Sequence, residues 1–125
     1  MVLIHGGGHC LFTRKDINKR QVEILLTAGI IPVSIDYRLC PEVNITEGPM
    51  TDVADAVQWA RSLSSLTLVE RPDLVLNGKV AVVGWSTGGT LAMSTAFNTL
   101  PRGIETPVAI LAFYCPTDYE SDCEY

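Results

Sequence analysis

A serine flanked by glycines is the residue of this sequence best suited to chemistry. Ser86 lies in the pattern Gly84-x-Ser86-x-Gly88, which follows Lys79 and the apolar run 80–83. In this pattern a buried strand turns sharply into a helix, and the serine hydroxyl stands above the sheet edge, where it can attack a carbonyl carbon. Glycine is needed on both sides because a side chain there would collide with the neighbouring strand or with the start of the helix.

Three consecutive glycines, Gly6, Gly7 and Gly8, form a second candidate element after the apolar residues 1–4. Attack of a serine on a carbonyl produces a negatively charged oxygen, and each backbone N–H donor aimed at it stabilises it by about 3–4 kcal/mol. We predict that these glycines, together with the N–H of Thr87, form such an oxyanion hole. The alternatives for the glycines alone are a flexible turn or a phosphate-binding loop. A nucleotide loop usually carries a Gly-Lys-Ser/Thr sequence, which does not occur in this chain.

The elements that must position these groups alternate between strand and helix patterns. The pattern predicts strands over 1–4, 32–35, 79–84 and 108–113, and helices over 15–28, 51–63 and 90–98. Such alternation indicates an α/β fold, with a central parallel sheet of about four strands and helices on both faces. Ligands of these sheets bind beyond the carboxyl ends of the strands, where both glycine clusters lie.

Three local features of these elements can be checked. The first predicted helix has an apolar stripe that suits one buried face, and Thr51 is placed to cap the second helix. Residues 64–78 are predicted as a connection, and a hairpin around Asn77-Gly78 is the alternative for its end.

Composition narrows the function classes. The chain has 125 residues, a net charge of −5 and no basic run, so we expect one domain and no nucleic-acid partner. No apolar stretch approaches the roughly 20 residues of a membrane span. The four cysteines lack metal-ligand spacing, so we expect neither a metal nor another cofactor. We interpret them as reduced thiols of a cytoplasmic protein, with disulfides as the alternative.

Three motifs occur together in this chain: His-Gly-Gly-Gly at 5–8, Asp-Tyr-Arg-Leu-Cys-Pro-Glu at 36–42 and Gly-Trp-Ser-Thr-Gly-Gly at 84–89. In order and spacing they resemble the hormone-sensitive-lipase-like carboxylesterase branch of the α/β-hydrolases. With His9 and the segments 47–52 and 111–119, the chain most resembles the C-terminal hydrolase or thioesterase domain of fungal non-reducing polyketide synthases.

The resemblance implies roles for individual residues. Ser86 matches the nucleophile, and Gly6 to Gly8 with Thr87 match the oxyanion hole. His5 matches a structural histidine, the segment 36–38 matches scaffold, and His9 and Trp85 are candidates for lining the substrate site. The implied substrate is a small acyl ester or a carrier-bound thioester, and the implied partner is the rest of a larger synthase chain.

The departures from the family concern the other catalytic groups. The family places its residues in the order serine, acid, histidine, and no histidine follows Ser86 in this sequence. Asp118 is the nearest candidate for the acid, although a turn residue is the better interpretation of it. The resemblance assigns residues 1–125 to the third through sixth strands of an eight-stranded domain, in the spatial order second, first, third, fourth. We therefore expect a partial domain, with little or no turnover from this chain alone.

Two other function classes compete with a serine hydrolase. The first is a non-catalytic hydrolase-like module that binds a small hydrophobic ligand between residues 5–12 and 85–90. Retention of both the serine and the triglycine argues against it, because a binding pocket needs neither. The second and weaker one is a doubly wound nucleotide or flavin binder.

Overall fold

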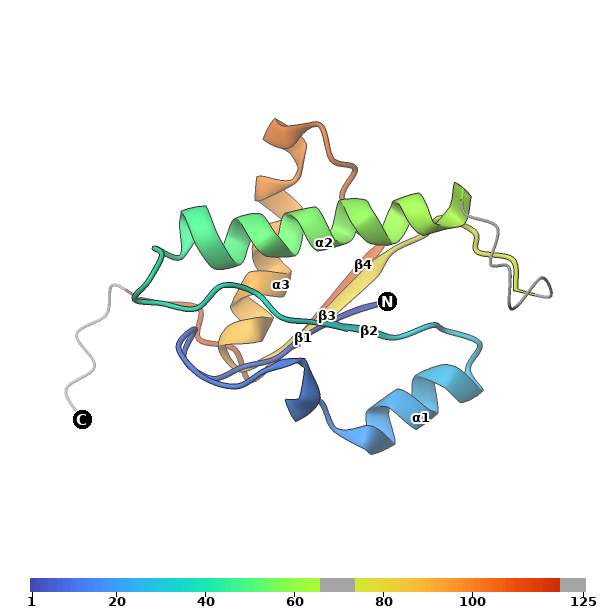
Figure 1. Ribbon diagram of the computed structural model, residues 1–125, viewed down its shortest axis with the longest axis horizontal. Helices are drawn as coiled ribbons and strands as arrows, with labels where there is room; N and C mark the ends of the chain where they lie inside the picture. Colours follow the sequence, from blue (N-terminus) through green and yellow to red (C-terminus); the bar gives the residue numbers. More distant parts are fainter. Residues whose placement is uncertain (66–73, 120–125) are drawn as a thin grey trace.

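The computed structural model describes residues 1–65 and 74–119, and within them it contains a four-stranded sheet and three α-helices (Figure 1). The strands are β1 (Val2–Ile4), β2 (Val33–Ile35), β3 (Ala81–Trp85) and β4 (Ala109–Phe113). The helices are α1 (Lys19–Thr27), α2 (Thr51–Ser62) and α3 (Thr87–Asn98).

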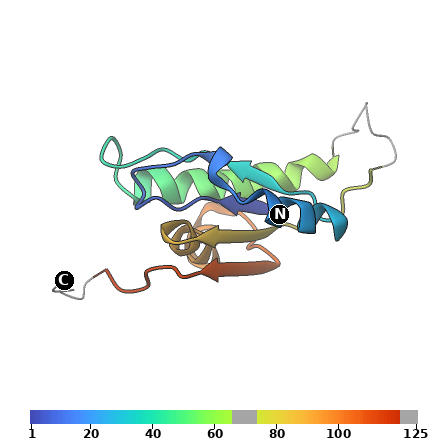
Figure 2. The ribbon, with the colours of Figure 1, turned by 90° about the horizontal axis from the view of Figure 1, so that it is seen from below.

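All strand pairs of the sheet are parallel, and the strand order is β2-β1-β3-β4. This is the spatial order that the family resemblance implies. Ile4 pairs in register with Gly84, and Trp85 pairs with Phe113, so the carboxyl ends of β1, β3 and β4 meet at one edge. Helices α2 and α3 lie on one side of the sheet and α1 on the other, as Figures 1 and 2 show together. The predicted fold class is therefore confirmed.

The hydrophobic core lies between the sheet and the two helices α2 and α3. Val53 and Val57 are fully buried on α2, as their i, i+4 spacing predicts. They belong to a cluster that includes Ile4 of β1, Val82 of β3 and Leu91 of α3. Burying each such side chain contributes about 1.5–3 kcal/mol, so this layer holds the strands that carry both glycine clusters.

The prediction that the first helix buries one face is wrong. Helix α1 begins at Lys19, where the side chain of Asn18 accepts a hydrogen bond from the backbone N–H of Arg20 at 2.9 Å. None of its residues is buried, and Ile24 is 57% exposed. The apolar stripe is present in the sequence, but no described element of the chain covers it.

Two helix starts also differ from the prediction. Thr51 does not cap α2, because a π-helical turn over Thr46–Met50 runs directly into that helix and Thr51 Oγ1 donates to the Thr46 carbonyl at 2.9 Å. Helix α3 begins at Thr87, three residues before the predicted start at 90. The reason is the abrupt backbone bend at Ser86, which ends the strand and starts the helix without a linker.

The connection between α2 and β3 lies partly outside the described residues, which omit 66–73. Its described end, residues 74–80, contains no strand, so the hairpin alternative is wrong for this stretch. The side chain of Asn77 accepts from the backbone N–H of Lys79 at 3.0 Å, a local bond that stabilises a loop.

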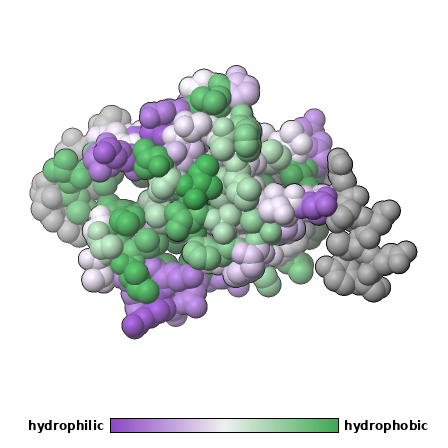
Figure 3. All heavy atoms as spheres, turned by 180° about the vertical axis from the view of Figure 1, so that it is seen from behind, coloured by the Kyte–Doolittle hydropathy of each residue, from purple (hydrophilic) through white to green (hydrophobic). Residues whose placement is uncertain are grey.

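Apolar side chains gather on the face that carries β4, which is one of the two edge strands of the sheet (Figure 3). Phe97 of α3 is 77% exposed, and Leu111 and Phe113 of β4 are also exposed. None of the helices in the described ranges is long and apolar enough to cross a membrane.

Candidate active site

Ser86 occupies the turn between β3 and α3. Its backbone has φ 53° and ψ −132°, a conformation that residues other than glycine rarely adopt and that costs about 1–3 kcal/mol. Two hydrogen bonds hold it: the Ser86 N–H donates to the Phe113 carbonyl at 2.9 Å, and the Gly89 N–H donates to the Ser86 carbonyl at 2.8 Å. The sharp bend that the glycine pattern predicts is present.

Glycines around this turn permit contacts between backbones that any side chain would block. A Cβ on Gly84 would lie 2.7 Å from the Gly89 nitrogen and still closer to the Gly88 carbonyl. A Cβ on Gly88 would lie 2.7 Å from the His5 carbonyl carbon. The first turn of α3 is thereby packed onto both its own strand and β1, which explains why glycine stands on each side of the serine.

The two glycine clusters meet at the carboxyl edge of the sheet. A Cβ placed on Gly6 would lie 2.9 Å from the Ser86 Cβ and 3.6 Å from its Oγ. The chain then bends away through Gly7 and Gly8, at φ 104° and 62°. Residues that are 80 positions apart in the sequence are therefore in direct contact, as the pairing of β1 with β3 requires.

Thr87 follows the serine as the first residue of α3. The N–H groups of a helix's first turn have no partner within the helix, so the Thr87 amide is available at this edge. Its side chain is buried, with the hydroxyl close to that of Tyr37.

His5 and Tyr37 hold the carbonyl groups at the start of the triglycine. The two rings stack with centroids 4.3 Å apart, and both are buried. The Tyr37 hydroxyl donates to the carbonyls of His5 at 3.0 Å and Gly6 at 3.2 Å. His5 Nδ1 lies 2.8 Å from the Gly6 oxygen, and since a carbonyl only accepts, Nδ1 carries the proton. Sequence reasoning missed this contact of Tyr37, because its partners lie more than 30 residues upstream.

The Tyr37 hydroxyl remains a donor at neutral pH. Burial raises the pKa of Tyr37 to about 12, and the neighbouring Cys10 and Cys40 thiols add to the rise, while the Thr87 hydroxyl opposes it. One phenol thus holds two successive carbonyls at the start of the triglycine, beside the turn that carries Ser86.

Replacing Tyr37 by phenylalanine is expected to destabilise the fold by about 1–3 kcal/mol. The change keeps the ring stacked on His5 but removes the only donor to the His5 carbonyl among the described residues. Urea unfolding followed by circular dichroism measures the loss. Tyr114, which is 78% exposed, provides the control Tyr114→Phe, which should change the midpoint little. Equal midpoints for Tyr37→Phe and wild type would contradict the role of the hydroxyl.

His9 and Trp85, the two candidates for lining the substrate site, lie in different surroundings. His9 is buried; its Nε2 lies 3.2 Å from the Tyr119 hydroxyl, which donates to Thr90 Oγ1 at 3.3 Å. Burial lowers the pKa of His9, so the ring is neutral at neutral pH. Trp85 instead stacks on Phe113 of the neighbouring strand, with centroids 6.0 Å apart.

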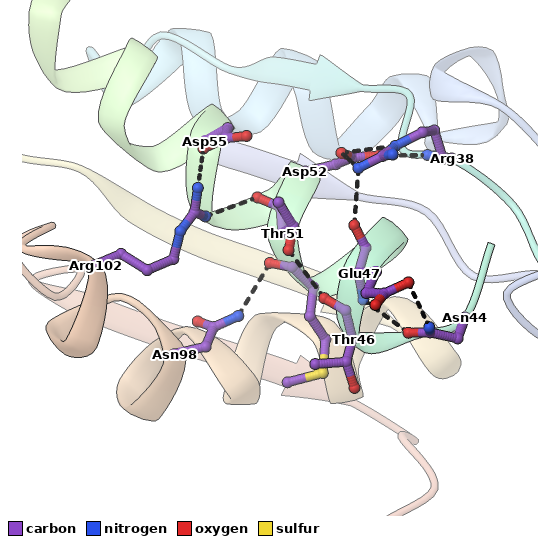
Figure 4. A network of polar contacts seen from close by, with 10 residues as sticks. Arg38, Asn44, Thr46, Glu47, Thr51, Asp52, Asp55, Asn98 and Arg102 are labelled. Atoms are coloured by element: carbon purple, nitrogen blue, oxygen red, sulfur yellow. Dashed lines mark hydrogen bonds and ion pairs between the residues drawn. The ribbon is translucent and has the colours of Figure 1, made fainter.

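Charged side chains fix the segment that follows β2. Arg38 binds Asp52 of α2 through its guanidinium at 2.8 to 3.1 Å and through its backbone N–H at 2.8 Å (Figure 4). Arg38 also donates to the Glu47 carbonyl at 2.9 Å. Asp36 pairs with Arg14 in the loop after the triglycine. Both acids therefore tie loops of the carboxyl edge together, which fits the expectation that 36–38 is scaffold.

The bond between Arg38 and Asp52 predicts acid sensitivity. Burial alone would raise the pKa of Asp52, but the Arg38 contacts outweigh it and the pKa is lowered. The pKa of Asp52 in the folded state therefore lies below its value in the unfolded chain, which is about 3.9. The bond stabilises the fold fully above that pH, and this stabilisation is lost as the pH falls through the folded-state pKa. The urea midpoint of Asp52→Asn should therefore lie below wild type above pH 5, and the gap should close below pH 4. A gap that stays constant from pH 7 to pH 3 would contradict the prediction.

A matched control for this experiment is Asp55→Asn on the same helix. Asp55 is half exposed and receives one bond from Arg102, at 2.6 Å (Figure 4). Exposed ion pairs contribute little to the free energy of unfolding. This variant should therefore change the urea midpoint at pH 7 less than Asp52→Asn does.

The described part of the chain has no cluster of side chains that could ligate a metal ion. Within residues 1–65 and 74–119, no group of three or more His, Cys, Asp or Glu side chains could hold a metal ion. The arrangement instead offers one hydroxyl on a strained turn, with the backbone of Gly6 and the first residue of α3 beside it.

Fungal polyketide synthases contain stretches that are similar in sequence to this chain. The chain is 57% identical over 122 residues to a 5-methylorsellinic acid synthase of Aspergillus terreus, covering 97% of this chain and 5% of that protein. It is 62% identical over 121 residues to the non-reducing polyketide synthase pkbA of Emericella nidulans, covering 95% of this chain and 5% of that protein. The chain thus spans about one twentieth of the length of these relatives.

Comparisons with solved structures and with family models agree on the fold. A bacterial heroin esterase matches with a TM-score of 0.69 and 28% identity, over 88% of this chain and 33% of that one. The iron-lacking apo form of EstFA matches with a TM-score of 0.60 and 23% identity, over 97% of this chain and 39% of that one. A family model described as the alpha/beta hydrolase fold matches residues 1–124. The chain therefore belongs to the alpha/beta hydrolase fold family, and its sequence relatives are fungal non-reducing polyketide synthases.

Proposed function

We propose that this chain carries the nucleophile and the oxyanion hole of a serine hydrolase that cleaves a carboxylic ester or thioester. The observation that supports this most is the contact between Gly6 and Ser86, which brings the backbone of the triglycine to the hydroxyl of a strained turn. In the proposed reaction Ser86 Oγ attacks the acyl carbon, and the N–H groups of the glycine turn and of Thr87 bind the oxyanion. The alcohol or thiol leaves, and water then releases the acid.

The relatives favour a thioester that is held by a carrier. Non-reducing polyketide synthases are long chains, and this sequence matches about one twentieth of each of them. A hydrolase domain within such a chain would act on an acyl group attached to another part of the same protein. We therefore propose polyketide release or editing as the role of the complete site, within the cytoplasm.

The proton acceptor for Ser86 is the missing component. His5 is stacked on Tyr37 and bonded to Gly6, which supports a structural role for it. No histidine follows Ser86 in the sequence, and loss of the base from a catalytic triad costs several orders of magnitude in rate. We therefore expect the purified chain to hydrolyse p-nitrophenyl esters barely above background. Rapid hydrolysis by the 125-residue chain would contradict this expectation.

The proposed function is tested by mapping the site of reaction with a fluorophosphonate probe. The probe is applied to the chain and to any longer protein that carries this sequence, and adducts are located by mass spectrometry. Trypsin releases residues 80–102, a peptide that contains both Ser86 and Ser94. Ser94 donates to the Leu91 carbonyl within α3 and serves as an internal control.

We expect the adduct on Ser86 and none on Ser94, with faster labelling in a protein that supplies the base. An N-acetylcysteamine thioester, which mimics a carrier thiol, should then be cleaved faster than the matching p-nitrophenyl ester. No adduct at Ser86 in the longer protein would contradict the proposal and would favour the non-catalytic binding module.

A further inference from the structure

Two cysteines that are 30 positions apart lie on turns that meet beside the glycine loop. The Cys10 N–H donates to the Gly7 carbonyl at 3.0 Å, within the turn that follows the triglycine. The Cys40 N–H donates to the His9 carbonyl at 2.8 Å. Residue 40 is thereby held next to the peptide bond that joins residues 9 and 10.

This hydrogen bond limits the distance between the two cysteines. The path from the Cys10 Cα through the His9 oxygen and the Cys40 nitrogen to the Cys40 Cα measures about 7 Å when fully straight, and the bond geometry shortens it. Disulfides usually join Cα atoms about 4.4–6.8 Å apart. The backbone thus holds the two Cα atoms at a separation that a disulfide can span.

The side chains of both cysteines act on the same neighbour. Each of the two sulfurs contributes to raising the pKa of Tyr37, which agrees with the backbone contact between their two loops. Cys10 is exposed and Cys40 is half-buried, and neither sulfur has a hydrogen-bond partner among the described residues. Cys115 differs, because its sulfur contacts the Met93 sulfur at 3.6 Å on the other side of the serine turn.

We propose that Cys10 and Cys40 are a modification site, at which a peroxide oxidises the two thiols to a disulfide. The exposed Cys10 thiolate attacks a peroxide oxygen, giving a sulfenic acid and, with hydrogen peroxide, one water. The Cys40 thiolate then attacks the sulfenic sulfur, forming the S–S bond and releasing a second water once the leaving hydroxide is protonated. The two thiols lose two electrons and two protons, which reduce hydrogen peroxide to two water molecules.

The bond would join the loop of the triglycine to the turn before Pro41. Gly7 and Gly8 depend on positive φ angles, and the loop they form is otherwise held by the Tyr37 and Cys40 hydrogen bonds. Oxidation would therefore restrict the segment that faces Ser86. This modification lies beyond the proposed function, and its test involves no hydrolytic step.

The experiment treats the chain with hydrogen peroxide and counts its thiols with Ellman's reagent. Because Cys123 lies outside the described residues, the measurement uses the double variant Cys115→Ser, Cys123→Ser, whose two remaining thiols should fall to none. The intact mass should drop by about 2 Da, and dithiothreitol should reverse both changes. Trypsin should release residues 1–14 and 39–61 as one cross-linked peptide before reduction.

Single variants show whether the pair is specific. Cys10→Ser and Cys40→Ser should each abolish the cross-linked peptide, whereas Cys115→Ser alone should leave it unchanged. If either of the first two fails to fold by circular dichroism, the peptide map of the wild-type chain still decides the question. A covalent dimer, a gain of about 32 Da on Cys10 from a sulfinic acid, or unchanged thiols would each overturn the proposal.

Discussion

Replacing Gly88 by alanine is expected to unfold this domain or to destabilise it by about 4 kcal/mol or more. The added Cβ would lie 2.7 Å from the His5 carbonyl carbon, and still closer to the carbonyl oxygens of Ile4 and His5. All three atoms belong to the backbone of β1 and its carboxyl end, which is bound to β2 and β3 on either side and cannot yield. Relief of the clash would require α3 to move off the sheet, which would open the hydrophobic core. Urea unfolding and the near-ultraviolet circular dichroism spectrum measure the effect.

Gly103→Ala is the matched control for this experiment. Gly103 has φ 68°, but nothing lies within 4 Å of a Cβ placed there. The same chemical change should therefore cost only the backbone strain, about 1–2 kcal/mol. If both variants lost the same stability, the contact between residue 88 and β1 would not be the reason why this position requires glycine.

Replacing Ser86 by alanine is expected to abolish reaction with the fluorophosphonate probe, and to reduce turnover in a protein with the complete site by as much as about 10⁶-fold. Alanine removes the hydroxyl but keeps a Cβ in the same strained turn, so the fold should survive. The measurement is the labelling rate, and circular dichroism confirms that the variant is folded. Ser94→Ala, in the same tryptic peptide, should be labelled at the wild-type rate.

The outcome for Ser86→Ala separates two explanations of any activity. Retained labelling would show that another nucleophile, for example the exposed Cys10, reacts with the probe. Retained turnover of esters would show that the oxyanion donors alone accelerate attack by water. Either result would remove Ser86 from the proposed mechanism.

The turn at Ser86 and its meeting with Gly6 could be predicted from the sequence because both depend on backbone geometry. Glycine at 84 and 88 leaves room for contacts that other residues would exclude, so its positions indicate where the backbone must approach. The strand order followed from the family resemblance. In contrast, periodicity could locate an apolar stripe near Ile24 but not show whether anything packs on it.

Contacts between loops were the part that the sequence could not predict. The hydrogen bonds of Tyr37 to His5 and Gly6 depend on how the end of β2 lies beside the end of β1. The approach of Cys40 to Cys10 depends in turn on both loops. Neither leaves a periodic pattern, although a tyrosine two residues after a predicted strand and before a proline-containing loop was a signal that a polar partner exists nearby.

At position 86, the residue that best suits the backbone differs from the residue that the proposed reaction needs. A φ of 53° suits glycine, so glycine at position 86 would relax the turn and give a sturdier protein with no hydroxyl to offer. Selection of this domain for stability alone would accordingly remove the proposed nucleophile, and a thermostability screen run without an activity readout should enrich the glycine variant.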